Sequence, residues 1–370
     1  MRIGRPLTAS AVPVLLLGLA VAACGGGGNG NGSATASGGS AKKIKIALLL
    51  PEHSTARYET QDRPHFENTV KSLCPNCSVV YENANQDASE QQSQADSVLT
   101  QGIDAMVLDP VDATSASTIV AKAKAQKVPV ISYDRLVSNA DLAAYISFDN
   151  KRVGRLQATT LEKKLAQDGN PKGPIVMING DPTDSNAHLF KEGASSVFSE
   201  DGVRIAKAYD TPGYTAANAQ NEMQQAITAL GNNGFEGVLA SNDDLGGAAI
   251  AAMKDAGIKP ATRPTTGQDA TVAGLQRILT GDQYMTVWKA IKPEAGAAAQ
   301  IAVALAKGDS VPSGLVNQQV NNGKKNVPSV ILVPTAVIKT NVNKVVQGGD
   351  VSKSDLCKGS FASACQAAGV

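Results

Sequence analysis

Short apolar runs rich in β-branched residues alternate with longer amphipathic segments along most of this chain. Residues 44–50 form a nearly continuous apolar run, which is typical of a parallel strand buried on both faces. The alternation that follows predicts helices at 64–73 and 88–101 and strands at 79–82, 105–108 and 130–133. Strands and helices in this order indicate βαβ units with a parallel sheet.

The same alternation restarts after residue 145. It predicts helices at 151–165, 187–199, 216–230 and 245–256 and strands at 175–179, 204–209 and 237–240. Two successive runs of this kind predict an α/β fold with two doubly wound, Rossmann-like lobes, each with a crevice at the carboxyl ends of its strands. We expect the two crevices to face each other and form a ligand cleft.

The first residues have the layout of a secretory signal peptide at 1–23, with Arg2 and Arg5, an apolar run from 11 to 22 and small residues before Cys24. The junction Val21-Ala22-Ala23-Cys24 resembles a bacterial lipobox, in which the cysteine becomes lipid-modified. The alternatives are ordinary cleavage near Ala23 or a membrane helix, but the apolar run is short for a bilayer of about 30 Å. Residues 24–41 are mainly Gly, Asn, Ser, Ala and Thr, which predicts a lipid-anchored flexible linker.

The net charge and the lack of catalytic motifs exclude several classes of function. Residues 1–23 hold two of the 34 basic residues and none of the 33 acidic ones, so the remaining chain has a formal charge of −1 and no basic field for nucleic acid. The three histidines, His53, His65 and His188, do not have metal-ligand spacing, and no nucleophile elbow or P-loop is present. We expect a binding protein with no catalytic residue, no metal and no cofactor.

Four cysteines remain besides Cys24: Cys74, Cys77, Cys357 and Cys365. In an exported protein they suggest two disulfides, for which three pairings exist. The local pairing, Cys74 with Cys77 and Cys357 with Cys365, loses the least entropy in loop closure. A redox pair or half of a zinc site is the alternative for Cys74 and Cys77, although a redox motif would open a helix rather than follow one.

Polar side chains follow several of the predicted strands, where a sheet of this type binds its ligand. They are Asp134, Arg135, Asp184 to Asn186, Asn242 to Asp244, Gln268 and Asp269. Turns and helix caps also use Asp and Asn, but they do not require Arg57, Arg135 or Lys289. Carboxylates, amides, cationic donors and aromatic rings together suit a sugar, whose hydroxyls donate and accept while its C–H face is apolar.

Six stretches carry a resemblance to the D-xylose-binding subgroup of periplasmic sugar-binding proteins, and it covers nearly all of residues 43–345. They are Ile131-Ser132-Tyr133-Asp134-Arg135, Tyr145-Ile146-Ser147-Phe148-Asp149-Asn150, Asp184-Ser185-Asn186-Ala187 with Leu189-Phe190, Ala240-Ser241-Asn242-Asp243, Gly267-Gln268-Asp269-Ala270 and Met285-Thr286-Val287-Trp288-Lys289. The resemblance implies a type I periplasmic binding protein, with crossovers between lobes near 148–150, 287–289 and 327–329. It thus implies an N-terminal lobe of 42–148 plus 289–327 and a C-terminal lobe of 149–288 plus 328–370.

The resemblance also implies the sugar contacts. Arg57 and Arg135 would come from the first lobe, Asp184, Asn186, Asn242 and Asp269 from the second, and Lys289 from near a crossover. Tyr58 and Tyr214 stand where the family stacks tryptophan on the sugar, and the segment 51–62 is one residue longer than the family pattern.

The implied function is that of a monomeric, extracytoplasmic lipoprotein that delivers a monosaccharide, D-xylose or a similar aldose, to an ABC permease and touches the membrane only through its lipid. The alternative is a sugar sensor that presents the loaded protein to a chemoreceptor or histidine kinase. A transcriptional regulator of the same fold would carry a helix-turn-helix where this chain has the export signal and linker.

Overall fold

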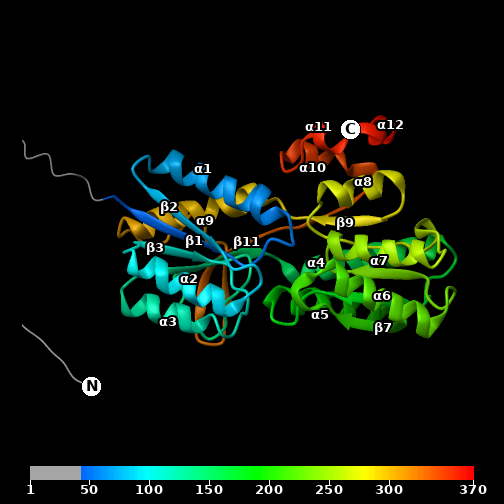
Figure 1. The fold of residues 1–370 in the computed structure, drawn as a ribbon, viewed down its shortest axis with the longest axis horizontal. Coiled ribbons are helices and arrows are strands. Elements are labelled where there is room, and N and C mark those ends of the chain that lie inside the picture. The colour runs from blue at the N-terminus through cyan, green and yellow to red at the C-terminus, as the bar shows by residue number, and fades with distance from the viewer. Residues whose placement is uncertain (1–42) are drawn as a thin grey trace, which may run out of the picture. The chain divides into compact units, whose positions relative to one another are not determined.

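Two main sheets, each covered by helices on both faces, and a small two-stranded sheet organise the computed structural model, which describes residues 43–370 (Figure 1). The predicted signal peptide, Cys24 and the linker lie outside the described residues. The predicted α/β fold with two doubly wound lobes is confirmed.

The first lobe contains a seven-stranded sheet in the order β10-β11-β5-β4-β3-β1-β2. Its strands are β1 (Lys45–Leu50), β2 (Ser78–Asn83), β3 (Ala105–Leu108), β4 (Val130–Tyr133), β5 (Ala144–Phe148), β10 (Gln318–Asn321) and β11 (Asn326–Leu332). All neighbours are parallel except β10, which is antiparallel to β11. The carboxyl ends of the parallel strands therefore share one edge of the sheet.

Side chains of β1 alternate between two cores because successive residues of a strand point to opposite faces. Ile46, Leu48 and Leu50 pack with α1 and α9, whereas Ala47 and Leu49 pack with α2 and α3. These helices are α1 (Arg63–Leu73), α2 (Ala88–Thr100), α3 (Ser117–Ala125) and α9 (Ile291–Ala306). Burial on both faces explains why the first strand is an uninterrupted apolar run.

The second lobe contains a parallel three-stranded sheet, β7-β6-β8, and an antiparallel pair, β12-β9. The strands are β6 (Ile175–Asn179), β7 (Ile205–Asp210), β8 (Gly237–Ala240), β9 (Met285–Trp288) and β12 (Thr335–Ile338). Residues 265–267 lie between the two sheets: Thr265 bridges to Val238, and Met285 and Val287 donate backbone hydrogen bonds to Thr265 and Gly267. This irregular segment leads directly to Gln268 and Asp269.

Helices cover both faces of the second sheet as well. They are α4 (Asn150–Gln167), α5 (Ser185–Asp201), α6 (Ala216–Leu230), α7 (Asp243–Asp255) and α8 (Val272–Thr280), with short helical turns η2 (Pro212–Tyr214) and η3 (Pro260–Thr262). The predicted amphipathic helix at 216–230 coincides with α6, which buries Ala219, Met223, Ala226 and Ile227.

Three crossovers connect the lobes, and the third differs from the prediction. The chain passes from β5 to α4 and from β9 to α9 at the expected places. However, β11 pairs with β5 as far as Leu332, so the third crossover lies between β11 and β12, and the predicted boundary at 327/328 falls inside β11. The apolar run continues to Val333, and Pro334, which has no backbone N–H for a ladder, ends the strand.

A C-terminal segment, residues 339–370, packs on α8. It contains the short elements η4 (Lys339–Asn341), α10 (Asn343–Gly348), α11 (Lys353–Leu356), η5 (Gly359–Phe361) and α12 (Ala362–Ala367). A disulfide joins Cys357 to Cys365, and another joins Cys74, directly after α1, to Cys77. This is the local pairing that loop closure favours.

Helices α4 and α5 touch through their backbones at two glycines. A Cβ atom on Gly154 would lie 1.9 Å from the carbonyl oxygen of Phe190, and one on Gly193 would lie 2.1 Å from that of Lys151. No side chain fits at these distances, so the two helices can approach only because both residues are glycine. The contact sets the position of α5, whose first turn lies at the end of the lobe that faces the cleft.

We predict that Gly154→Ala lowers the free energy of unfolding by about 1–3 kcal/mol, because the helices must separate or bend. Gly296→Ala in α9 is the matched control, since a Cβ there has no atom within 4 Å. It should be neutral or raise the stability by about 0.5–1 kcal/mol. Urea unfolding of both variants measures the difference, and equal midpoints would contradict the prediction.

Candidate functional site

One cavity between the lobes brings together all nine side chains that the sequence singled out for sugar binding. We call it the interlobe cavity, and its empty volume is about 290 Å³. It is lined by Thr55, Arg57, Tyr58, Asp134, Arg135, Asp184, Asn186, Phe190, Tyr214, Asn242, Gln268, Asp269 and Lys289.

The first lobe supplies Arg57 and Tyr58 from the segment after β1. Residues Tyr58–Asp62 form a single π-helical turn, η1, in which Arg63 N–H donates to the carbonyl of Tyr58. A π turn contains one residue more than an α turn and often marks a functional site. Arg57, directly before this turn, lines the cavity.

The first lobe also supplies Arg135, which follows β4. Its guanidinium lies between two aromatic rings, 6.0 Å from the ring centre of Tyr58 and 5.7 Å from that of Tyr214. Its Nε lies 3.5 Å from Asp184 and 3.7 Å from Asp109. The cation is therefore held by carboxylates and ring faces from both lobes.

The second lobe supplies two residues that also cap helices. Asp184 accepts a hydrogen bond from Asn186 N–H at the start of α5, and Asn242 accepts one from Leu245 N–H at the start of α7. Capping uses Oδ1 of Asp184, while Oδ2 accepts the hydroxyl hydrogen of Tyr214 at 2.6 Å. The capping role and the site role expected from the sequence are therefore compatible.

Three residues that line the cavity have a left-handed backbone. The φ angle is 51° at Asp134, 51° at Tyr214 and 85° at Asp269. Such angles are uncommon outside glycine, cost of the order of 1–3 kcal/mol each, and cluster at functional sites. The surrounding fold holds these residues in strained conformations that direct them toward one cavity.

The charges in the cavity are buried and paired across the lobes. Lys289 lies 3.8 Å from Asp134 of the first lobe and 3.4 Å from Asp269 of the second. Burial alone would raise the pKa of Asp134, but Lys289, Arg57 and Arg135 outweigh it and lower that pKa to about 2. Asp134 is therefore a carboxylate at any physiological pH.

Some polar atoms in the cavity wall have no hydrogen-bond partner anywhere in residues 43–370. They are Arg135 Nε, Gln268 Oε1 and Asp269 Oδ1, all buried. Buried polar atoms without partners are rare in folded proteins and require an explanation. One donor and two acceptors on the wall of one cavity match a ligand that is rich in hydroxyl groups.

Direct contacts between the lobes surround the cavity. Asn186 Nδ2 donates to the backbone carbonyl of Asp134 at 3.1 Å, and Leu136 N–H donates to Ser185 Oγ at 2.9 Å. Nearby, Ala113 N–H donates to the carbonyl of Thr183 at 3.2 Å. These bonds enclose the site, and the side chains that line it are almost completely buried.

Four lining residues were not assigned to the site from the sequence. Asp134 and Gln268 were recognised as strand-end residues, and their adjacency to Arg135 and Asp269 was the available signal. Phe190 lies four residues after Asn186 in α5, hence on the same helix face, which an i, i+4 argument could have found. Thr55 precedes the π turn and carried no such signal.

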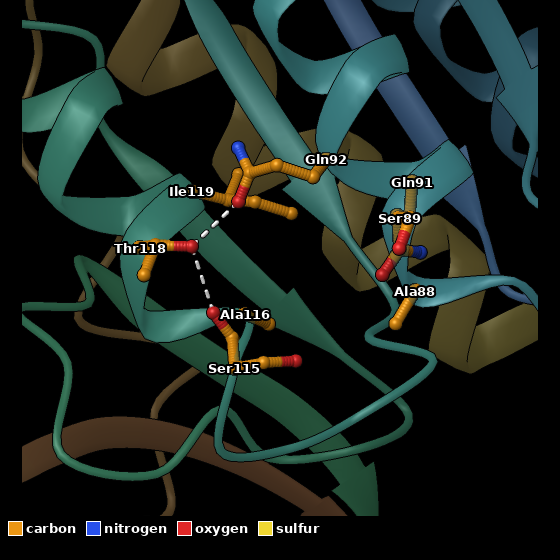
Figure 2. A pocket seen from close by; sticks show the side chains of 8 residues that line it. All are labelled: Ala88, Ser89, Gln91, Gln92, Ser115, Ala116, Thr118 and Ile119. Atoms are coloured by element: carbon orange, nitrogen blue, oxygen red, sulfur yellow. Dashed lines mark hydrogen bonds between the residues drawn. The ribbon is translucent and has the colours of Figure 1, made fainter.

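A second hollow, lined by residues of the first lobe, lies between the N-terminal ends of α2 and α3 (Figure 2). It is lined by Ala88, Ser89, Gln91, Gln92, Ser115, Ala116, Thr118 and Ile119. The Thr118 hydroxyl lies within hydrogen-bond distance of Gln92 Oε1 and the Ser115 carbonyl. The described residues that line it include no charged or aromatic side chain, so it lacks the groups that hold a sugar ring.

Metal and membrane features were also sought in the described chain. Within residues 43–370, no cluster of three or more His, Cys, Asp or Glu side chains is arranged to hold a metal ion. None of the helices in that range combines the length and the hydrophobicity needed to cross a membrane.

Comparisons with known proteins agree with this geometry. Residues 46–310 match the model of a family described as periplasmic binding protein domain. The chain is 36% identical to the D-xylose-binding periplasmic protein of Haemophilus influenzae over 310 residues, which cover 83% of this chain and 90% of that protein. It is also 36% identical to the D-xylose-binding periplasmic protein of Escherichia coli over 321 residues, which cover 85% and 93%. A crystal structure of an ABC transporter solute binding protein from Clostridium phytofermentans with bound β-D-glucose superposes with a TM-score of 0.75 at 28% identity, covering 84% of this chain and 99% of that one.

The low pKa of Asp134 predicts how stability changes with pH. The pKa is about 2 in the folded protein and about 3.9 in an unfolded chain. The carboxylate therefore stabilises the fold above about pH 4, and this contribution of about 2–3 kcal/mol is lost as the pH falls through about 2.

Asp134→Asn should reduce the decline in unfolding free energy between pH 4 and 2, as measured by urea titrations. Asp309→Asn, at an exposed position, should keep the wild-type slope; identical slopes for all three proteins would refute the assignment.

Proposed function

Because the chain belongs to the periplasmic binding protein family, we propose that it is the substrate-binding lipoprotein of an ABC sugar importer and that it binds an aldopyranose in the interlobe cavity. Members of this family work outside the cytoplasm. The observation that carries the proposal is that three buried atoms in the cavity wall, Arg135 Nε, Gln268 Oε1 and Asp269 Oδ1, form no hydrogen bond with residues 43–370.

The hydroxyl groups and the apolar face of a sugar ring match the side chains that line the interlobe cavity. Each hydroxyl both donates and accepts, so a ring with several hydroxyls can pair with the carboxylate, the amide and the guanidinium at once. The aromatic side chains of Tyr58, Tyr214 and Phe190 also line the cavity and supply apolar surface for the C–H face. A ligand with a net charge would leave this balanced set of cations and carboxylates uncompensated.

The two tyrosines add hydroxyls where the family has tryptophan, and both hydroxyls are engaged within the protein. Tyr58 donates to Asp134 Oδ2 at 3.2 Å, and Tyr214 donates to Asp184 Oδ2 at 2.6 Å. Each carboxylate therefore has one oxygen occupied by a phenol. This arrangement reduces the number of acceptors open to the sugar without removing the aromatic faces.

D-xylose is our first candidate ligand. It has the ring and hydroxyl configuration of D-glucose and lacks only the C6 hydroxymethyl group. The two curated relatives are named for D-xylose, whereas the superposed crystal structure contains β-D-glucose. The identity to the D-xylose-binding relatives, 36%, exceeds the 28% to the glucose-bound protein and favours the pentose.

Closure of the lobes is the proposed signal to the permease. Residues of both lobes line the cavity, so a bound sugar stabilises the closed form through contacts that an open form cannot make. The three crossovers are the only covalent connections between the lobes in the described chain, and they are the natural hinges.

Calorimetric titration of residues 43–370, the unit that contains both lobes, tests the proposal with D-xylose, D-glucose, L-arabinose, D-galactose and D-ribose. We expect micromolar affinity for D-xylose, about −8 kcal/mol. Asp269→Ala should weaken it by one to two decades, because a hydrogen bond to a charged partner contributes about 1.5–3 kcal/mol. Asp309→Ala is the exposed control and should bind as the wild type does. Absence of binding across the panel would reject a monosaccharide function.

The membrane anchor forms a separate part of the proposal. The junction before Cys24 has the lipobox pattern, and the Gly-rich residues 25–41 would separate the sugar-binding unit from the lipid. Lipid attachment would keep the binding protein near its permease while leaving both lobes free to close.

We predict that Cys24→Ser moves the full-length protein from the membrane fraction of expressing cells to the soluble extracytoplasmic fraction. Incorporation of a labelled fatty acid should be lost in the same variant, because serine offers no thiol for the diacylglyceryl group. Cys74→Ser together with Cys77→Ser is the control and should stay in the membrane fraction. Retention of the label on Cys24→Ser would disprove the anchor.

A further inference from the structure

Arg57 presents its nitrogen atoms to two different environments. Nε and Nη2 donate to the two carboxylate oxygens of Asp62 at 3.0 and 2.6 Å, and Nη2 also donates to Glu294 Oε2 at 3.0 Å. Nη1 lies on the other side, 3.5 Å from Asp134 and 4.0 Å from Asp269, both of which line the interlobe cavity. The two edges of the guanidinium thus have separate roles.

The carboxylates behind Arg57 do not line the cavity. Asp62 is 1% exposed and Glu294 is fully buried. Asp62 also accepts the hydroxyl hydrogen of Tyr133 at 2.5 Å, so its position is itself constrained. Neither carboxylate can touch a ligand in the cavity without displacing Arg57.

We propose that Asp62 and Glu294 are positioning residues, which hold the guanidinium of Arg57 so that Nη1 faces the sugar before the lobes close. This inference rests on the proposed sugar-binding function. Arg57, Asp62, Tyr133 and Glu294 all belong to the first lobe, since α9 packs on α1 and the first sheet. The oriented arginine is therefore assembled without any residue of the second lobe.

Preorganisation of this kind favours affinity because the entropy of ordering a long side chain is lost during folding and not during binding. A bidentate pair with a carboxylate also fixes the plane of a guanidinium, which a single contact cannot do. The first lobe would then present a rigid donor to the arriving sugar, and the second lobe would add Asp269 and Lys289 on closure.

The two carboxylates should respond differently to amide substitution. Asp62 receives only donors, two N–H groups of Arg57 and the hydroxyl of Tyr133. An amide nitrogen at that position would face a donor, so Asp62→Asn breaks the pair of hydrogen bonds between Arg57 and residue 62. Glu294 accepts through Oε2, while its Oε1 has no hydrogen-bond partner within residues 43–370. Glu294→Gln can keep its oxygen toward Arg57, whereas Glu294→Ala cannot.

The first arm of the test needs no sugar. In residues 43–370, the Nε–H signal of Arg57 is observed by ¹⁵N NMR and assigned by its loss in Arg57→Lys. We expect a single, slowly exchanging signal in the wild type and in Glu294→Gln, and fast exchange with solvent in Asp62→Asn, which loses the acceptor of Nε–H. In Glu294→Ala, which removes a contact of Nη2, exchange should be faster than in Glu294→Gln. Fast exchange in the wild type would overturn the proposal, whether or not any sugar binds.

The second arm measures D-xylose affinity in a double-mutant cycle. We expect Asp62→Asn and Glu294→Ala to weaken binding about 10–100-fold, the range known for residues that orient metal ligands, and Glu294→Gln to weaken it less than about threefold. In an Arg57→Lys background the same changes should have little further effect. Undiminished losses in that background would show that the carboxylates act on the fold and not through Arg57.

Thermal unfolding of each variant and the exposed control Asp309→Asn separates misfolding from loss of positioning. If Asp62→Asn does not fold, the comparison of Glu294→Gln with Glu294→Ala still decides the question through both arms. A wild type that binds no sugar while showing the protected Arg57 signal would reject the proposed function and leave the positioning role supported.

Discussion

A charge that is taken out of water must be paired, and the interlobe cavity is organised by this constraint. The cavity contains three cations, Arg57, Arg135 and Lys289, each only 2–4% exposed. Arg57 is paired within the first lobe, whereas Lys289 lies between Asp134 of the first lobe and Asp269 of the second. When the lobes come together, the charge of Lys289 is therefore paired from both sides, and the space for a ligand is enclosed at the same time.

The two-lobed fold provides such pairs because the residues that follow parallel strands gather at one edge of each sheet. Asp134 and Arg135 follow β4, Asp184 opens α5 after β6, and Asn242 opens α7 after β8. Residues that cap helices therefore also line the cavity, and close packing of the helices behind them holds these residues in position. The close contact of α4 with α5 at Gly154 and Gly193 is one example, because it fixes the position of the helix that carries Asn186 and Phe190.

Two features of the cavity wall bear on the sugar that it accepts. The π turn η1 follows Arg57 and places Asp62 against the guanidinium. Tyr58 and Tyr214 supply aromatic faces, and each hydroxyl donates to a carboxylate. These hydroxyls occupy acceptors that a sugar would otherwise meet, so ligand preference need not follow that of the relatives.

The sequence by itself determined the order and type of the elements, because burial on both faces of a parallel strand and on one face of a helix leaves a periodic pattern in the chain. Capping and turns do not explain Arg57, Arg135 and Lys289, and the resemblance to a family located the other six candidate residues; all nine line one cavity. Only the tertiary structure decided that β11 pairs with β5 as far as Leu332 and that Glu294 contacts Arg57. Both outcomes depend on contacts between residues far apart in sequence, 237 positions in the case of Arg57 and Glu294, and local pattern carries no information about such contacts.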